Sequence, residues 1–506
     1  MFQIDTSIII RELERSINLF KPETTLLITL LIGIIVDVVF KKVRNIVGYL
    51  SLVGFIISFI FLFYLPNESQ PSFFAMIVVD PFSLFFKQII LISSIIVIVL
   101  SLFSKELQDS KHNLGEYYIF ITGMAFGMFL LSGATNLVMI YLAIETMSIS
   151  SYILTGYTKE VQRSSEASLK YVIFGAVSSA LMIYGISILY GLTGTLNLFG
   201  ISDMLNRANI SVIPLMISGL LILAGLGYKI SAVPFHFWTP DVYEGAPITI
   251  TAFLSVASKA AGFAVLIRFL KITFVDFSAP LQVEAWSILK GIDWKLIIAI
   301  LSVLTMTVGN VVALWQTNLK RLLAYSSIAH AGYILMGLVV FNDTGLTAIL
   351  VYIIVYLIMN FGAFLVVMLV ANKIGSEEID DYNGLAYRSP FIAVCFAIFL
   401  VSLTGLPPTA GFIGKLYLFA ALIKTNYIWL AIIGILNSVI GLYYYAKVFR
   451  NMYIRETDFD KTKTIEFSPV IKLLLLVFAI PSILFGLYFT PIVNWAQASI
   501  KIFGIQ

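Results

Sequence analysis

Long apolar runs, each of the length that crosses a lipid bilayer, recur along almost the whole 506-residue chain. A helix of about 20 apolar residues spans the hydrocarbon core, where only helices and closed barrels satisfy their own backbone polar groups. The chain is 59% hydrophobic and 12% charged, which leaves more apolar surface than one water-soluble core can bury. We therefore expect an all-α polytopic membrane protein with about fourteen transmembrane helices. The expected spans lie near residues 24–40, 46–65, 83–103, 115–133, 136–156, 167–193, 211–235, 247–272, 293–317, 319–341, 344–372, 390–424, 427–450 and 470–490.

The charges outside these runs predict the orientation. Lysines and arginines gather in the loops after odd-numbered spans, and fewer, among them Arg268 and Lys271, are assigned to the other side. By the positive-inside tendency, both termini then face away from the cytoplasm. The first twenty residues are too charged for a cleaved signal peptide, and we expect them to lie along the interface or to form a disordered terminus.

The chain offers little for a metal or redox centre. Its single cysteine, Cys395, excludes an intrachain disulfide and any four-thiolate cluster. The histidines, His112, His236 and His330, lie far apart in the sequence. No nucleotide-binding glycine motif occurs, and the basic residues are scattered among loops. We therefore expect no cofactor, metal or nucleic acid bound to this chain.

Charged side chains inside predicted spans are the main indication of function. Glu145 lies within NLVMIYLAIETMSISSYILTG, Lys259 within PITITAFLSVASKAAGFAVLI, and Lys229 at an interruption in GLGYKISAVPFHFW. An ion at mid-bilayer costs at least about 2.5 kcal/mol, so such residues persist where they face one another or a wet interior. His330 and Lys415 extend this set to five titratable groups on different spans.

Four of these residues also have a purely structural interpretation, whereas Lys259 lies about a dozen residues from either end of its span and is harder to explain in this way. Lys229 fits a helix-end lysine that reaches the headgroups, and Glu145 fits polar glue between helices. His330 alone is more often a packed core residue, and Lys415 fits a helix cap. A common role is favoured because all five recur at similar expected depth on separate spans.

Two predicted spans are interrupted in the same manner. The breaks are expected at Gly227–Lys229 with Pro234, and at Thr404–Pro408 with Lys415 shortly after. Backbone groups freed at membrane depth must be satisfied by protein or water, so each break is a candidate ion site. Matching breaks predict two inverted five-helix repeats. The expected domains are residues 1–110 with spans one to three, 111–275 with the first repeat, 276–455 with the inverted second repeat, and 456–506 with the last helix.

Five longer segments carry a family resemblance: IYLAIETMSISSYILTGY, SSEASLKYVIFGAVSSALMIYGISILYG, KISAVPFHFWTPDVYEGAP, KRLLAYSSIAHAGY and GLPPTAGFIGKLYLF. They closely resemble the antiporter-like membrane subunits of respiratory complex I, above all the subunit N group of NADH-quinone oxidoreductases, called subunit 2 in mitochondria and plastids. The resemblance covers roughly residues 24–490. It implies that Glu145, Lys229, Lys259, His330 and Lys415 form a proton relay.

The resemblance also implies a setting for the chain. It would be a non-redox translocase subunit in a bacterial cell inner membrane, and it would contact other membrane-arm and peripheral-arm subunits, including adjacent antiporter-like ones. NADH, FMN, iron–sulfur clusters and quinone would be bound by those partners. Two alternatives stay open: a subunit of a multisubunit sodium/proton antiporter, and a non-transporting membrane scaffold.

The charges themselves suggest how such a relay would work. A Glu145–Lys229 ion pair would keep the lysine protonated, and opening the pair would release its proton toward Lys259. Waters and His330 would then carry the proton to Lys415.

Overall fold

The chain folds into a bundle of membrane-spanning helices. The computed structural model describes residues 6–40, 45–66, 68–110, 113–207, 210–275, 292–455 and 464–502. Within these ranges, 13 helices are long and apolar enough to cross a membrane, and a further span consists of α18 (Pro390–Thr404) and α19 (Ala410–Lys424). The predicted all-α polytopic architecture with about fourteen spans is therefore confirmed. The 13 spans are α2 (Lys21–Val39), α3 (Ile46–Phe63), α4 (Pro81–Phe103), α6 (Gly115–Gly133), α7 (Leu137–Thr155), α8 (Gln162–Thr193), α10 (Val212–Ile230), the span Ile248–Phe274, α14 (Trp294–Ala313), α15 (Leu319–Val339), α16 (Asp343–Ile374), α20 (Ile428–Tyr453) and α21 (Pro469–Leu487).

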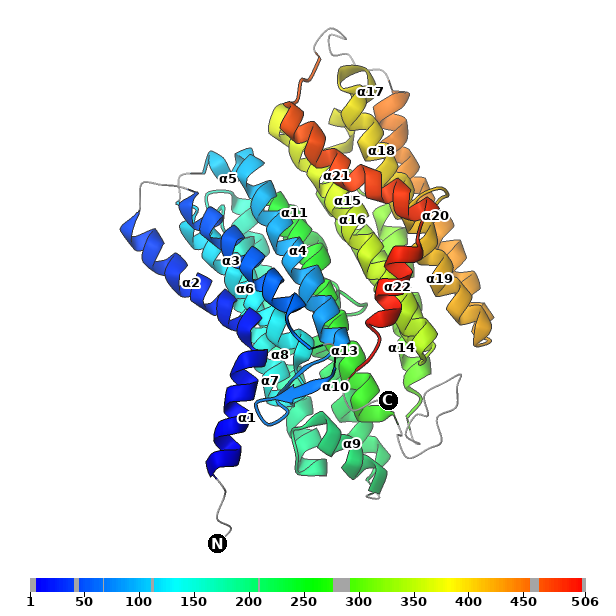
Figure 1. Ribbon diagram of the computed structural model, residues 1–506. Coiled ribbons are helices and arrows are strands. Elements are labelled where there is room, and N and C mark those ends of the chain that lie inside the picture. Colours follow the sequence, from blue (N-terminus) through cyan, green and yellow to red (C-terminus); the bar gives the residue numbers. More distant parts are fainter. Residues whose placement is uncertain are drawn as a thin grey trace.

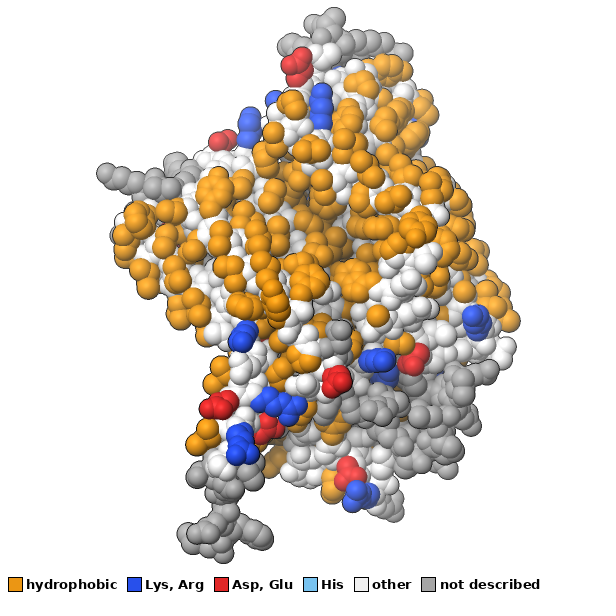
Figure 2. All heavy atoms as spheres, viewed as in Figure 1, with side chains coloured by type: hydrophobic (Ala, Val, Ile, Leu, Met, Phe, Trp, Pro, Cys, Tyr) orange, Lys and Arg blue, Asp and Glu red, His pale blue; other side chains and the backbone are white. Residues whose placement is uncertain are grey.

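The helices form two groups that lie side by side. In Figure 1, α2 to α13 make one group and α14 to α21 the other, and both chain ends lie at the same end of the bundle. Hydrophobic side chains form a wide band around the visible face, with most charged side chains above and below it (Figure 2). Such a band is the surface expected of a protein that faces lipid.

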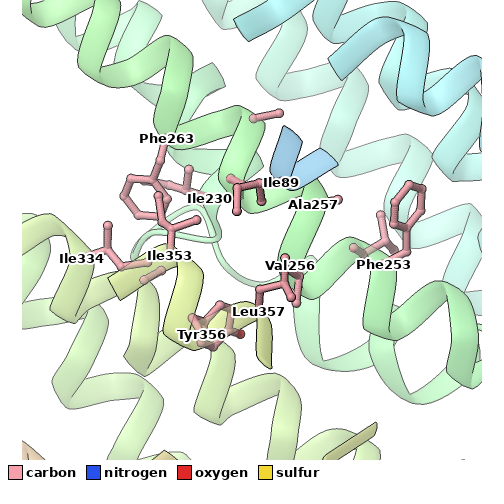
Figure 3. Packing of buried hydrophobic residues seen from close by; sticks show 14 of the residues in the cluster. Ile89, Ile230, Phe253, Val256, Ala257, Phe263, Ile334, Ile353, Tyr356 and Leu357 are labelled. Atoms are coloured by element: carbon pink, nitrogen blue, oxygen red, sulfur yellow. The ribbon is translucent and has the colours of Figure 1, made fainter. Parts of the chain in front are cut away.

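The span Ile248–Phe274 and helices α15 and α16 form the enclosed centre of the bundle. Almost every side chain on these helices is buried, so they pack against protein on all sides. Figure 3 shows Val256 of the span Ile248–Phe274 beside Tyr356 and Leu357 of α16.

The sequence predicts one uninterrupted helix for this central span, but the helix changes type along its length. It consists of α12 (Ile248–Phe253), a π-helical turn η1 (Leu254–Ser258) and α13 (Lys259–Phe274). Single π turns inside helices occur frequently at functional sites. Here the turn ends immediately before Lys259.

Both predicted helix breaks are present, but one of them begins later than expected. The break at Thr404–Pro408 is confirmed, because α18 ends at Thr404 and Gly405 has φ +85°. The break expected at Gly227–Lys229 with Pro234 is also present and contains Pro234, but it begins after Lys229, since α10 continues to Ile230. The chain leaves the helix at Ser231, whose φ is +61°, and resumes in α11 (Trp238–Gly245). Gly227 serves close packing instead: a Cβ there would lie 2.8 Å from the Phe235 ring.

Several smaller elements escape hydropathy analysis because they are short or amphipathic. The N-terminal segment, expected at the interface or disordered, contains a helix, α1 (Thr6–Leu19). Strands β1 (Gln70–Ser72) and β2 (Ile77–Val79) form an antiparallel hairpin. The other short elements are α5 (Lys105–Gln108), α9 (Leu198–Arg207), η2 (Ile379–Tyr382), α17 (Leu385–Arg388) and α22 (Thr490–Ala498).

A buried ion pair ties the hairpin end to the centre of the bundle. The Arg268 guanidinium of α13 donates to both carboxylate oxygens of Asp80 at 2.8 and 2.9 Å, and both side chains are fully buried. Asp80 also caps α4 by accepting from the Ser83 amide. Arg268 and Lys271 both lie inside α13, within the predicted eighth span.

Replacing Gly332 with Ala should destabilise the protein by about 1–3 kcal/mol, because α14 and α15 touch through their backbones there. A Cβ at Gly332 would lie 2.5 Å from the Met306 amide nitrogen, which cannot move without moving α14. Thermal unfolding of the detergent-solubilised protein measures the effect. Gly191→Ala is the matched control, since a Cβ there meets nothing described within 4 Å. Equal stability of both variants would contradict this close packing.

Candidate functional site

The five candidate residues lie on five different helices of the bundle. Glu145 is on α7, Lys229 on α10, Lys259 on α13, His330 on α15 and Lys415 on α19. Four of them are buried: Lys229, Lys259, His330 and Lys415. Glu145 is half-buried. Buried ions in such a bundle need partners, so the contacts of each residue decide what it can do.

Lys229 occupies the last turn of α10, directly before the break. Its Nζ atom has no hydrogen-bond partner among the described residues. Instead it lies 5.6–5.9 Å from the ring centres of Tyr152, Tyr171 and Tyr228. Ring faces and the negative end of a helix dipole favour a cation, but they replace its hydrogen bonds only in part. The ammonium is therefore held weakly.

Glu145 does not pair with Lys229 in this conformation. Its Oε1 atom accepts a hydrogen bond from Ser179 of α8, and no salt bridge joins the two described side chains. The Glu145–Lys229 pair stays a prediction for a second conformation.

Lys259 connects the central span to α15. Its Nζ atom donates to the Ser327 carbonyl oxygen at 2.7 Å and to the Ser327 hydroxyl at 2.8 Å. Lys259 also lies near Lys229, because α10 and α13 meet at Gly262, where a Cβ would lie 3.4 Å from the Lys229 Cβ. Lys259 thus stands between the two helix groups.

His330 is hydrogen-bonded through both ring nitrogens. Nδ1 lies 2.7 Å from the Tyr352 hydroxyl, and Nε2 lies 3.4 Å from the Tyr445 hydroxyl. Tyr445 in turn lies 2.5 Å from the Ser326 hydroxyl, next to the serine that receives Lys259. Imidazole can accept a proton at one nitrogen while releasing one from the other. A nearly continuous polar path therefore runs from Lys259 to His330.

Lys415 closes the second helix break. Its Nζ atom donates to the Thr404 carbonyl at the end of α18, at 2.7 Å, and to the Ser438 hydroxyl at 3.1 Å. It also lies 4.5 Å from the centre of the Tyr333 ring. The structural interpretation of Lys415 as a cap thus holds for its contact with Thr404. The Ser438 hydroxyl in turn lies 3.4 Å from the Tyr333 hydroxyl.

Sequence reasoning missed the hydroxyl groups that connect the charged residues. A tyrosine in an apolar span is usually a core residue, so the sequence alone did not indicate that Tyr352 and Tyr445 contact His330. The pair Ser326–Ser327, four and three residues before His330, was a usable signal because it lies within one helical turn of the histidine.

The described part of the chain contains no group of three or more His, Cys, Asp or Glu side chains that could hold a metal ion. His112 lies outside the described residues.

Broken helices around a row of buried ionisable side chains define a class, the ion-translocating polytopic membrane proteins. Residues 134–441 match the family model described as "NADH:quinone oxidoreductase/Mrp antiporter, TM". The chain belongs to this family.

Curated relatives match the chain over almost its full length. NADH-quinone oxidoreductase subunit N 2 of Chloroherpeton thalassium is 47% identical over 514 residues, covering 100% of this chain and 99% of that protein. NADH-quinone oxidoreductase subunit N of Chlorobium chlorochromatii is 46% identical, covering 98% and 97%.

Solved structures show the same architecture. A chain of respiratory complex I from Thermus thermophilus matches with a TM-score of 0.76 and 27% identity, over 94% of this chain and 99% of that one. A chain of the Mrp complex from Dietzia sp. matches with a TM-score of 0.78 over 96% and 97%, but at 18% identity it shares the fold alone.

Proposed function

We propose that this chain is a proton-translocating membrane-arm subunit of a bacterial NADH-quinone oxidoreductase, with no redox centre of its own. The observation that carries this proposal is two hydrogen-bonded sets on neighbouring serines of α15: Lys259 donates to Ser327, and the adjacent Ser326 contacts Tyr445, which contacts His330. Near-full-length relatives named as subunit N of such enzymes support it. NADH, FMN, iron–sulfur clusters and quinone belong to partner subunits in this proposal.

The proposed relay starts at the weakly held Lys229 ammonium. When Glu145 swings inward, the ion pair keeps Lys229 protonated; when it returns to Ser179, the proton moves to Lys259. From Lys259 it passes over the serine and tyrosine hydroxyls to His330, and then to Lys415. The structure corresponds to the state with the pair open. Energy for the cycle comes from a neighbouring subunit.

The exposed side of Glu145 supports assembly with such a neighbour. Leu142 and Ile149, on the same face of α7, are 53% and 55% exposed, so this face lies at the outside of the bundle. A half-buried carboxylate at mid-span is costly against lipid. We infer that an adjacent membrane-arm subunit covers this face and supplies a polar or cationic group to Glu145.

The two inverted repeats belong to the same proposal. Residues 111–275 contain one broken helix, α10–α11, and residues 276–455 contain the other, α18–α19, and each carries a lysine. The lysines differ in position, because Lys229 precedes its break and Lys415 follows its break. In the proposed repeat the two broken helices therefore correspond to each other, but the two lysines do not occupy equivalent positions.

Glu145→Gln should lower proton pumping by about tenfold or more while the complex still assembles, because glutamine keeps the hydrogen bond to Ser179 but cannot hold a charged Lys229. Pumping is measured in membrane vesicles that contain the complex. Asp203→Asn, an exposed carboxylate paired with Arg207 on α9, is the control. If Glu145→Gln prevents assembly, the residue is structural.

Purification of the tagged chain from native membranes tests the assignment itself. Partners that bind FMN and iron–sulfur clusters are expected. Copurification with sodium/proton antiporter subunits would instead support the second candidate, which the fold shared with the Mrp chain permits.

A further inference from the structure

A polar cavity of about 620 Å³ lies at the end of the bundle that is opposite the chain termini. Its wall includes Glu106 of α5, Asn318 at the start of α15, Glu377 and Glu378. It reaches Ile248, the first residue of α12 (α5 and α11 mark this end in Figure 1). Lysine and arginine asymmetry predicts that this end faces the cytoplasm. In the proposed relay Lys259 passes its proton on toward His330, and a route from that side would reload Lys259 in addition to the transfer from Lys229.

Two charged side chains, Glu106 and Lys320, bind the backbone of the short junction between α11 and α12. A carboxylate oxygen of Glu106 accepts from the Ile248 amide at 3.2 Å. The buried Lys320 Nζ donates to the Ala246 carbonyl at 2.8 Å and lies 3.2 Å from a Glu377 carboxylate oxygen.

Burial raises the pKa of Glu106 above its ordinary value; Lys320 opposes this rise and Glu377 adds to it. Lys105, Asp109, Arg163 and Glu378 are the other charged groups around the cavity. A raised pKa lets Glu106 take up a proton closer to neutral pH than a surface glutamate does.

Two buried hydroxyl groups without partners in the described chain lie near Ser327. Tyr243 of α11, three residues before Ala246, and Tyr356 of α16 both have hydroxyl groups that lack a hydrogen bond within the described chain. Both lie beside Ser327, the serine that receives Lys259. A buried polar atom left unpaired costs about 1–3 kcal/mol, so such atoms call for an explanation, such as water or a proton in transit.

The geometry along α15 fits a short route. Ser327 follows Lys320 by seven residues, which places it on the same helix face roughly 10 Å deeper. Tyr243 bridges much of this interval, because its backbone lies near Ala246 and its hydroxyl lies near Ser327.

We propose that this cavity is the proton-intake vestibule of the subunit, that Glu106 collects the proton at its floor, and that the Tyr243 hydroxyl passes it to Lys259. This inference rests on the proposed function. Glu106 releases its proton to water in the cavity. The Tyr243 oxygen accepts a proton from that water while its own proton leaves toward the neutral Lys259 amine. One O–H bond is thus replaced by one N–H bond, and Tyr243 returns to its starting state by rotating its hydroxyl.

Two substitutions separate proton intake from structural support. Tyr243→Phe removes only an oxygen that has no partner in the described structure, so a structural role predicts little or no loss of stability. Glu106→Gln keeps an acceptor for the Ile248 amide, so the junction stays capped. Neither variant retains the proton-carrying group.

The experiment measures proton pumping by the intact complex in vesicles between pH 6 and 9. Tyr243→Phe should lower pumping at least about tenfold with normal assembly. Glu106→Gln should shift the pH profile of pumping to lower pH. Without Glu106, protons must be captured directly from bulk water, and this capture becomes limiting first at high pH. The double variant should be no worse than Tyr243→Phe, since the two groups act in series. Tyr382→Phe, whose hydroxyl donates to the Val367 carbonyl elsewhere, and Asp203→Asn should pump normally.

Normal pumping by Tyr243→Phe, or an unchanged pH profile of Glu106→Gln, would overturn the intake proposal. A parallel Lys259→Met variant tests the relay separately from the intake route. If that variant fails to pump while Tyr243→Phe and Glu106→Gln pump normally, the intake route is wrong and the proposed function stands. If Lys259→Met itself pumps normally, the relay through Lys259 is wrong, and Lys259 has a structural role.

Discussion

Replacement of Lys259 by Met is expected to reduce proton pumping of the assembled complex by about two orders of magnitude or more. Methionine has a similar length but no ammonium, so it cannot donate to the carbonyl and hydroxyl of Ser327. The row of serine and tyrosine hydroxyls toward His330 then has no proton-carrying group at its start. Because Lys259 lies between Lys229 and α15, the loss interrupts the relay in the middle.

The measurement pairs pumping with electron transfer. Coupled quinone reduction should fall with pumping, while NADH oxidation by an artificial acceptor at the peripheral arm should stay near normal. Lys373→Met, which removes an exposed lysine near the end of α16, is the matched control. Leaving Ser327 without its donor costs about 1–3 kcal/mol, so the amount of assembled complex must be measured as well. Normal proton-to-electron ratios would return Lys259 to a structural role.

Arg268→Met is expected to destabilise the chain by about 3–5 kcal/mol, enough to lower assembly strongly. The substitution leaves the Asp80 carboxylate fully buried without its guanidinium, next to the carbonyl of Ser132 that Arg268 also contacts. An unpaired buried charge is far more costly than a lost surface pair. Assembly yield and the free energy of unfolding in mild detergent measure the effect.

The double variant Asp80→Asn with Arg268→Met provides the stringent comparison. Asparagine removes the stranded charge and still accepts from the Ser83 amide at the start of α4, so part of the stability should return. Arg207→Met, at an exposed pair on α9, should change stability by less than about 1 kcal/mol. A double variant as unstable as the single one would mean that shape, and not charge, dominates this site.

The sequence by itself determined the number of spans, the break at Thr404–Pro408 and the burial of Lys259. These features depend on neighbours along the chain: hydropathy over about 20 residues sets a span, and glycine with proline ends a helix. The same local reasoning placed the start of the first break too early, because Gly227 packs against Phe235 inside α10 and the helix ends at Ile230.

The tertiary structure decided which groups each charge contacts. Lys259 meets Ser327 at a separation of 68 residues, and Arg268 meets Asp80 at a separation of 188. It also decided that Glu145 accepts a hydrogen bond from Ser179 and forms no salt bridge with Lys229 in this conformation. Local pattern predicts that a side chain is buried but not its partner, because the partner lies on another helix and is set by how the helices pack.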